Sequence, residues 1–297
     1  MARQPARKRK SRSHKPPKQK DELPTPEKGI SRDEAEEIEE HSRLRAAVLY
    51  EIIRVEGEGE LARSAPALAW SGLAAGLSIG LSVVAQAMLA THLPEAEWKP
   101  MIEKFGYSAG FIVVIMARQQ LFTENTLTPV LPVIARMKLK WLAVLLRLWA
   151  IVLSANLAGC LIFAAAIAYT SMLPPEMEQN VRLIGEHLMK NTATEMFVKG
   201  IAAGWIIAAL VWTLPSAQNT EFFLIGLLTY LIALGEFTHV IAGSVEAFYL
   251  WVTGSIGAGK VFLQFLLPTL AGNVVGGTVL FAVLSYAQVR EEIGAGK

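Results

Sequence analysis

The sequence has little of what soluble enzymes and secreted domains use. It contains one cysteine, Cys160, which excludes a framework of internal disulfides, and only five histidines. We recognise no Gly-rich phosphate loop, metal-ligand cluster or nucleophile–base pair, so we expect neither an enzyme nor a bound cofactor or metal. Charged residues make up 18% of the chain, less than the roughly 25% that is average for soluble proteins.

Hydrophobic residues, in contrast, are abundant at 53% and are gathered into long runs. A helix that spans a bilayer needs roughly 20 apolar residues, and six runs are long enough. They cover residues 65–90, 106–136, 141–171, 193–214, 222–253 and 256–289. The sequence therefore predicts an all-α polytopic membrane protein with six transmembrane helices, and the lipid bilayer is its expected environment.

Two of the runs are interrupted by polar residues near their middle. The second carries Arg118 to Thr128, and the fifth carries Glu236 to His239. Backbone that leaves the helix at membrane depth is tolerated only where it lines a cavity or is buried in protein. Two such breaks in corresponding places of two halves indicate a substrate path near the midplane. We therefore expect helices two and five to be broken and to build the path.

Spans three and six share an N-x-x-G pattern, with Asn156 and Gly159 in one and Asn273 and Gly276 in the other. Together with the paired breaks, this pattern predicts two three-helix halves. Because each half has an odd number of spans, the halves must be inverted relative to each other. We assign residues 61–290 to this transmembrane transporter domain.

Positive charge is concentrated ahead of the first span, where 15 of the 28 Lys and Arg residues precede Ser64. The positive-inside rule then places the N-terminus in the cytoplasm, and six spans return the 291–297 tail to the same side. We interpret residues 1–30 as a disordered basic tail, because they hold no apolar cluster. Attraction to anionic lipid explains its charge better than nucleic acid does, and we do not expect nucleic acid as a partner.

Residues 31–60 are predicted to form a cytoplasmic amphipathic helix. Ser31 and Glu34 form a capping-box pattern at its start. Its apolar stripe is expected to comprise Leu44, Val48, Ile52 and Val55. We expect this helix to lie along the cytoplasmic face, packed on the membrane domain or on a neighbouring subunit.

Four motifs in the membrane part resemble the formate/nitrite transporter family. They are Leu121–Thr126 (LFTENT), Phe197–Ile201 (FVKGI) followed by Trp205 and Val211-Trp212, His239 with Ala242, and Leu270–Gly277 (LAGNVVGG). The likeness covers about 60–290, and the motifs stand in the correct order and spans. It implies an aquaporin-like fold and a homopentamer with one pore per subunit in the bacterial inner membrane. It also implies passage of small monovalent anions such as formate or nitrite, sometimes coupled to protons.

His239 is the histidine that the predicted spans enclose, and an ionisable group at mid-membrane is by default a functional hypothesis. An imidazole can pass a proton to a weak-acid anion, so the solute could cross an apolar constriction uncharged. The alternative is a neutral histidine held by backbone carbonyls that the break releases. From the other half, Thr123 would present its hydroxyl to His239, although a threonine at a helix break often only caps the backbone.

The remaining site residues follow from the motifs and the resemblance. Besides His239 and Thr123, we predict that five further residues line the pore or bind substrate: Leu121, Phe122, Asn125, Thr238 and Arg118. By spacing, the apolar constrictions are Tyr107, Phe111 and Ile232, and Lys190 resembles a family lysine that draws anions into the vestibule.

The chain also departs from the family pattern. Thr238 stands where the family commonly has an acid, and Gly204 stands where it has an asparagine. Arg118 makes the approach to the first break unusually positive, unless Glu124, Glu236 or Glu246 neutralises it. The leading hypothesis is an anion transporter or channel. Its alternatives are a neutral-solute pore on the same fold, favoured if Arg118 is buried in a salt bridge, and a membrane-anchored binding protein that uses the basic tail.

Overall fold

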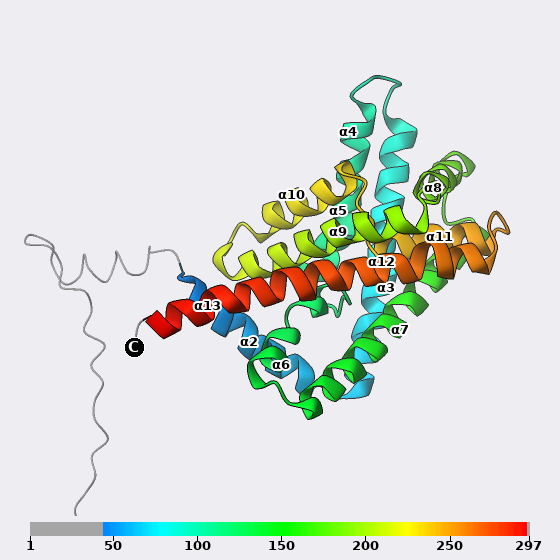
Figure 1. The fold of residues 1–297 in the computed structure, drawn as a ribbon. Coiled ribbons are helices and arrows are strands. Elements are labelled where there is room, and N and C mark those ends of the chain that lie inside the picture. Colours follow the sequence, from blue (N-terminus) through cyan, green and yellow to red (C-terminus); the bar gives the residue numbers. More distant parts are fainter. Residues whose placement is uncertain (1–43, 296–297) are drawn as a thin grey trace, which may run out of the picture. The chain divides into compact units, whose positions relative to one another are not determined.

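The computed structural model describes residues 44–295, with side chains to residue 292, and is helical without strands over that part of the chain. Four helices are long and apolar enough to cross a membrane (Figure 1). They are α3 (Ala65–His92), α7 (Leu139–Tyr169), α9 (Ala193–Thr213, continued by η3, Leu214–Ser216) and the stretch Lys260–Glu292. The last stretch joins η4 (Lys260–Leu266), α12 (Leu267–Val274), η5 (Val275–Ala282) and α13 (Val283–Ala295), of which η4 and η5 are π-helical.

The other two apolar runs each fold into two shorter helices. In the first, η1 (Lys104–Tyr107) leads into α5 (Ser108–Met116), and after an irregular segment with η2 (Glu124–Thr126) the chain continues as α6 (Val130–Arg136). In the second, α10 (Glu221–Leu234) is separated from α11 (Ala242–Val252) by seven non-α-helical residues. The polar stretches that the sequence singled out are therefore the stretches where the backbone leaves the α-helix.

Both interruptions begin with the same helix ending. Arg118 (φ 51°) and Glu236 (φ 52°) adopt the left-handed conformation directly after α5 and α10. The next N–H closes each end by bonding back over the last turn, from Gln119 to the Val114 carbonyl (3.0 Å) and from Phe237 to the Ile232 carbonyl (2.9 Å). This is the Schellman pattern, in which glycine is the usual left-handed residue. Here a cation and an acid occupy it instead.

Glycines allow the long helices to approach closely. A Cβ on Gly76 of α3 would lie 2.1 Å from the Asn156 carbonyl oxygen of α7. A Cβ on Gly204 of α9 would lie 2.3 Å from the Asn273 carbonyl oxygen of α12. Small residues at such crossings are how helices associate in lipid. The same contact also explains Gly204, since an asparagine side chain has no room at this crossing.

The cytoplasmic helix predicted over 31–60 corresponds, within the described residues, to α2 (Ala46–Ala62). Residues 1–43, with the predicted tail and the Ser31 capping box, lie outside the described part. α2 packs against α6 and α13. Its buried side is formed by Leu49, Tyr50, Ile53, Gly57 and Leu61.

The predicted apolar stripe of this helix does not pack on the rest of the described chain, because Leu44, Val48 and Val55 are exposed, so packing of the stripe on a neighbouring subunit stays a prediction. The face that packs is set by Gly57, whose added Cβ would lie 2.1 Å from the Thr128 carbonyl oxygen, and by Glu58, which pairs with Arg136 of α6. The packed face therefore combines the close approach at Gly57 with buried apolar residues that include Leu49, Ile53 and Leu61.

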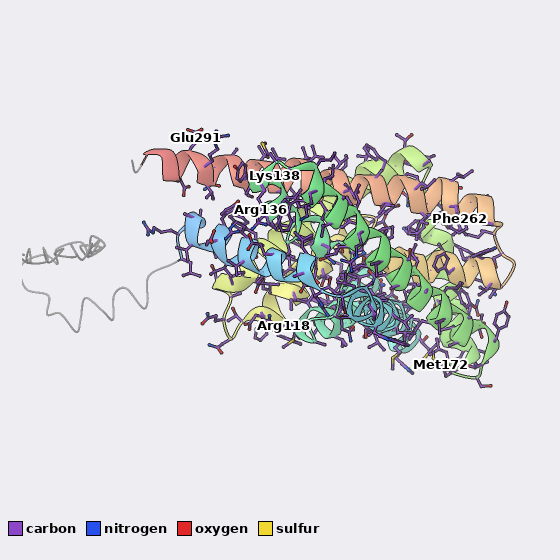
Figure 2. The ribbon with its side chains drawn as sticks, turned by 90° about the horizontal axis from the view of Figure 1, so that it is seen from below. Arg118, Arg136, Lys138, Met172, Phe262 and Glu291 are labelled. Atoms are coloured by element: carbon purple, nitrogen blue, oxygen red, sulfur yellow. The ribbon has the colours of Figure 1, made fainter. Side chains whose placement is uncertain are left out.

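Two short helices cover one end of the bundle. α4 (Lys99–Glu103) follows α3, and α8 (Pro175–Leu188) packs on α3 and α11 (Figure 1). We call this the α4–α8 end. Figure 2 shows Met172 and Phe262 towards one side of the view, whereas Arg118, Arg136 and Lys138 lie towards the other.

Candidate functional site

Thr123 and His239 meet inside the protein, each carried by one of the two interruptions. Thr123 Oγ1 lies 2.7 Å from His239 Nε2, and the two residues are 0% and 2% exposed. The other ring nitrogen, Nδ1, accepts the backbone N–H of Ala242 at 3.2 Å. A ring nitrogen that accepts carries no proton, so the imidazole is neutral with its proton on Nε2. His239 therefore donates to Thr123, and the Thr123 hydroxyl proton is left to donate elsewhere.

Two buried asparagines hold the interruptions in place. Asn156 of α7 accepts the Phe122 N–H (2.9 Å) and donates to the carbonyls of Gln120 and Gly72 (2.8 Å each). Backbone groups that leave a helix in the interior need such partners. The first interruption is also fastened to η5, where Thr278 Oγ1 donates to the Thr126 carbonyl at 2.6 Å.

Asn273 of α12 makes the corresponding set of bonds in the second half. It accepts the Val240 N–H (2.8 Å) and donates to the carbonyls of Thr238 (2.9 Å) and Gly200 (2.8 Å). The two N-x-x-G motifs thus supply the side chains that satisfy the two irregular segments.

A cavity of about 480 Å³ runs from the α4–α8 end down to His239. Its floor includes Tyr107, Thr238, His239, Gly243 and Glu246. Its charged lining comprises Glu95, Lys99, Glu103, Lys104, His187, Glu236 and Glu246. The cavity therefore connects one end of the bundle to the Thr123–His239 pair.

Most of these charges are paired. Lys99 contacts Glu95 and Glu103, and its hydrogen bond to Glu95 raises the pKa of the lysine. Glu236 is held by His187 (2.8 Å) and by Lys199 (3.7 Å).

The predicted constriction residues lie around His239 or in the core. Phe111 packs edge-on against the imidazole with ring centroids 5.0 Å apart. The Tyr107 and Phe111 ring centroids are also 5.0 Å apart. Ile232, on α10, is fully buried. Tyr107 and Phe111 thus form an aromatic column from the cavity to the imidazole, and Ile232 belongs to the surrounding core.

The other predicted pore residues make contacts within the protein around the interruptions. The Phe122 ring packs against the ring of Trp149 on α7, with centroids 5.7 Å apart. Asn125 Nδ2 donates a hydrogen bond to Gln120 Oε1 at 3.0 Å. Leu121 is buried and its carbonyl accepts the Asn125 N–H. Thr238 lines the cavity, but its hydroxyl is bonded to the Met196 carbonyl at 2.7 Å. These contacts hold the loops in place, and the pore role of these residues stays a prediction.

Arg118 and Lys190 are placed differently from the rest of the predicted site. Arg118 is exposed and, among the described residues, forms none of the ion pairs with Glu124, Glu236 or Glu246 that the sequence offered. It lies past the end of α5, which runs beside α10. Lys190 is exposed and does not line the cavity, so its assignment to the vestibule stays a prediction. The lysines of the cavity lining are Lys99 and Lys104.

Sequence reasoning missed three charged residues of the cavity lining. Lys104 and His187 come from segments treated as loops, and Glu246 was considered only as a partner for Arg118. The available signal was periodicity: Gly243 and Glu246 are three residues apart, which places them on one face of the helix that follows His239.

The model for the formate/nitrite transporter family matches residues 47–287. The chain belongs to this family. Its members are transporters and channels, not enzymes. Inner membrane protein YfdC of Escherichia coli is 45% identical over 249 residues, which cover 84% of this chain and 80% of that protein. Formate channel FocA of Haemophilus influenzae is 26% identical over 240 residues, covering 72% and 83% of the two chains.

Solved structures show the same fold. A pentameric formate channel with formate bound matches with a TM-score of 0.67 at 21% identity, over 76% of this chain and 98% of that one. An FNT family ion channel matches with a TM-score of 0.63 at 20% identity, over 82% and 96%. The chain therefore has the channel fold of the formate/nitrite transporter family.

Proposed function

We propose that this formate/nitrite transporter family member carries small monovalent anions of the formate or nitrite type across the membrane past the Thr123–His239 pair. The observation that carries the proposal is the 2.7 Å contact between the two interruptions at the foot of the cavity. Its relative FocA is a formate channel, and a structural neighbour holds formate. Both support this substrate class.

The proposed topology has six spans in two inverted halves. α3, α5–α6 and α7 form the first half, and α9, α10–α11 and α12–α13 form the second. The matching asparagine bonds and helix endings support this division. The basic connection between Arg136 and Lys140 then faces the cytoplasm with both termini, and the α4–α8 end faces outward. Residues 61–290 form the transporter domain in this proposal.

The proposed setting is a homopentamer in the bacterial inner membrane. The relative YfdC is named an inner membrane protein, which supports a location in the inner membrane. The structural neighbour is a pentameric channel, which supports a pentameric assembly. Large apolar side chains remain exposed along α10, including Phe222, Phe223 and Leu227. Such a surface requires lipid or a neighbouring subunit to cover it.

In this proposal the pair works as a hydrogen-bond relay. The neutral imidazole orients the Thr123 hydroxyl, whose proton can bind an anion's oxygen. For His239 to relay a proton, Nδ1 must take up a proton of its own. To do so, it must first lose the hydrogen bond that it accepts from the Ala242 N–H. Coupling to protons therefore entails a local rearrangement of the 239–242 turn, whereas simple binding does not.

Uptake of radiolabelled formate and of nitrite into proteoliposomes, measured across pH, tests the proposal. Wild-type flux should saturate with substrate, and His239→Ala should reduce it by at least about tenfold, since loss of an orienting hydrogen-bond donor typically costs that much. His92→Ala, on α3 at the α4–α8 end, serves as the control and should retain flux. Unchanged transport in His239→Ala would contradict the assigned role. Wild type that carries neither substrate would contradict the function.

The binding-protein alternative depends on residues 1–30, which lie outside the described part. Deleting them should leave flux intact if the chain is a transporter.

A further inference from the structure

Glu246 is a buried acid of the cavity that the proposed relay does not use. It is 6% exposed, lies on α11, and lines the cavity together with His239 and Gly243. Among the described residues, its carboxylate takes part in none of the hydrogen bonds or ion pairs, whereas the other three cavity acids are all paired. A buried, unpartnered carboxylate that faces a cavity is available to a ligand.

The charges around Glu246 come from three elements. Lys104 and Tyr107 of η1 line the same cavity as Glu246. His187 of α8, with Glu236 and His239 from the 235–241 segment, completes the titratable groups of the deeper cavity. The lining presents four carboxylates against two lysines, and Lys199, which is outside the lining, pairs with one of those carboxylates, Glu236. The approach to His239 from the α4–α8 end is therefore acidic, which is unfavourable for an entering anion.

We propose that Glu246 is a specificity-determining residue that admits permeants from the α4–α8 end as neutral weak acids and rejects their anions. The O–H of the protonated acid donates to the Glu246 carboxylate, whereas the anion brings a second negative charge and no donor. This inference rests on the proposed function and specifies the form in which the substrate enters. The acid then reaches the His239 imidazole, which lines the same cavity, and the Thr123 hydroxyl that is bonded to it.

Electrical recording separates the two forms, because a neutral acid carries no current and an anion does. In planar bilayers and matched proteoliposomes, wild type should take up labelled formate with little formate current, and uptake should fall by about tenfold per pH unit above the acid's pKa. Glu246→Gln keeps an acceptor oxygen but removes the charge. It should raise the ratio of anion current to acid uptake by at least about tenfold, which is 1.4 kcal/mol of discrimination.

Glu176→Gln is the matched control, since it removes an exposed carboxylate of α8 that does not line the cavity. It should change the ratio by less than about twofold, because an exposed charge outside the cavity is screened by solvent. Lys104→Gln provides a second variant, should Glu246→Gln fail to fold. It removes the positive charge that faces Glu246, so it should lower the residual anion current.

An unchanged ratio in Glu246→Gln, or a raised anion current in Lys104→Gln, would overturn the inference while leaving transport itself intact. The inference would also be overturned if wild-type formate transport were carried mainly by the anion, measured as an electrical current that accounts for most of the uptake. Absence of both uptake and current in wild type would instead count against the proposed function.

Discussion

Asn156 and Asn273 make the same three hydrogen bonds in the two halves of the chain. Each accepts one N–H from its interruption, donates to a carbonyl two residues earlier in that segment, and donates to a glycine carbonyl of a long helix. The interruptions bring Thr123 and His239 to within 2.7 Å of each other. The geometry of the pair therefore depends on two amide side chains that do not touch it.

We predict that Asn156→Ala and Asn273→Ala destabilise the protein to a similar degree. Each leaves one N–H and two carbonyls without partners in the interior, and each such group costs about 1–3 kcal/mol, so the total should reach at least about 3 kcal/mol. Thermal unfolding of the detergent-solubilised protein measures the loss. Asn180→Ala is the control, because its side chain makes one part-buried bond, to Thr91 at 2.9 Å. A loss in only one of the two variants would contradict the equivalence of the halves.

Thr123 can be tested without changing the volume of the site. Thr123→Val keeps the shape but removes the hydroxyl that lies beside His239, so we expect formate flux to fall by at least about tenfold. Thr123→Ser retains the hydroxyl and should keep most of the flux. A stability measurement should accompany each flux assay, because removing a buried hydroxyl can also lower the stability of the protein. If valine transports as well as serine, the hydroxyl does not act on the permeant.

The general architecture was accessible from the sequence because apolar length and interrupted runs are strong signals in membrane proteins. The all-helical fold and the irregular segments around Thr123 and His239 follow from that pattern. So do the two asparagines, which the repeated N-x-x-G motif marked. What the motif did not show is that the asparagines bond the loops rather than each other.

The lining of the cavity was less predictable, because it is assembled from segments far apart in the chain. Lys104, His187 and Glu246 come from η1, α8 and α11, and no spacing relates them. Lys190 was chosen for its resemblance to a family lysine, whereas the lysines that line the cavity are Lys99 and Lys104. The face of α2 that packs on the described chain carries Leu49, Ile53 and Leu61 together with Gly57, and the sequence alone did not distinguish it from the neighbouring stripe.

Glycines at the helix crossings should be sensitive to a single methyl group. In Gly76→Ala and Gly204→Ala the new Cβ would meet a backbone carbonyl oxygen at 2.1 and 2.3 Å, so the helices must separate. We expect a loss of about 1–3 kcal/mol in each case. Gly226→Ala on α10 is the contrast, since no atom lies within 4 Å of its Cβ, and better helix propensity should stabilise it by about 0.5–1 kcal/mol. Equal effects at all three sites would show that crowding is not the cause.

Arg118 combines an unusual backbone with a charge, and two substitutions separate these properties. Its φ of 51° suits glycine and is unfavourable for any residue with a Cβ, so Arg118→Gly should be more stable than Arg118→Ala by about 1 kcal/mol. Both remove the guanidinium, which is exposed beyond the end of α5.

If this cation attracts anions to the path, as the sequence suggested, both variants should lose formate flux by the same few-fold factor, and high salt should abolish the difference from wild type. Arg136→Ala, whose side chain pairs with Glu58, is the control for charge elsewhere. Flux that differs between the glycine and alanine variants would mean that the backbone at residue 118, rather than its charge, controls passage.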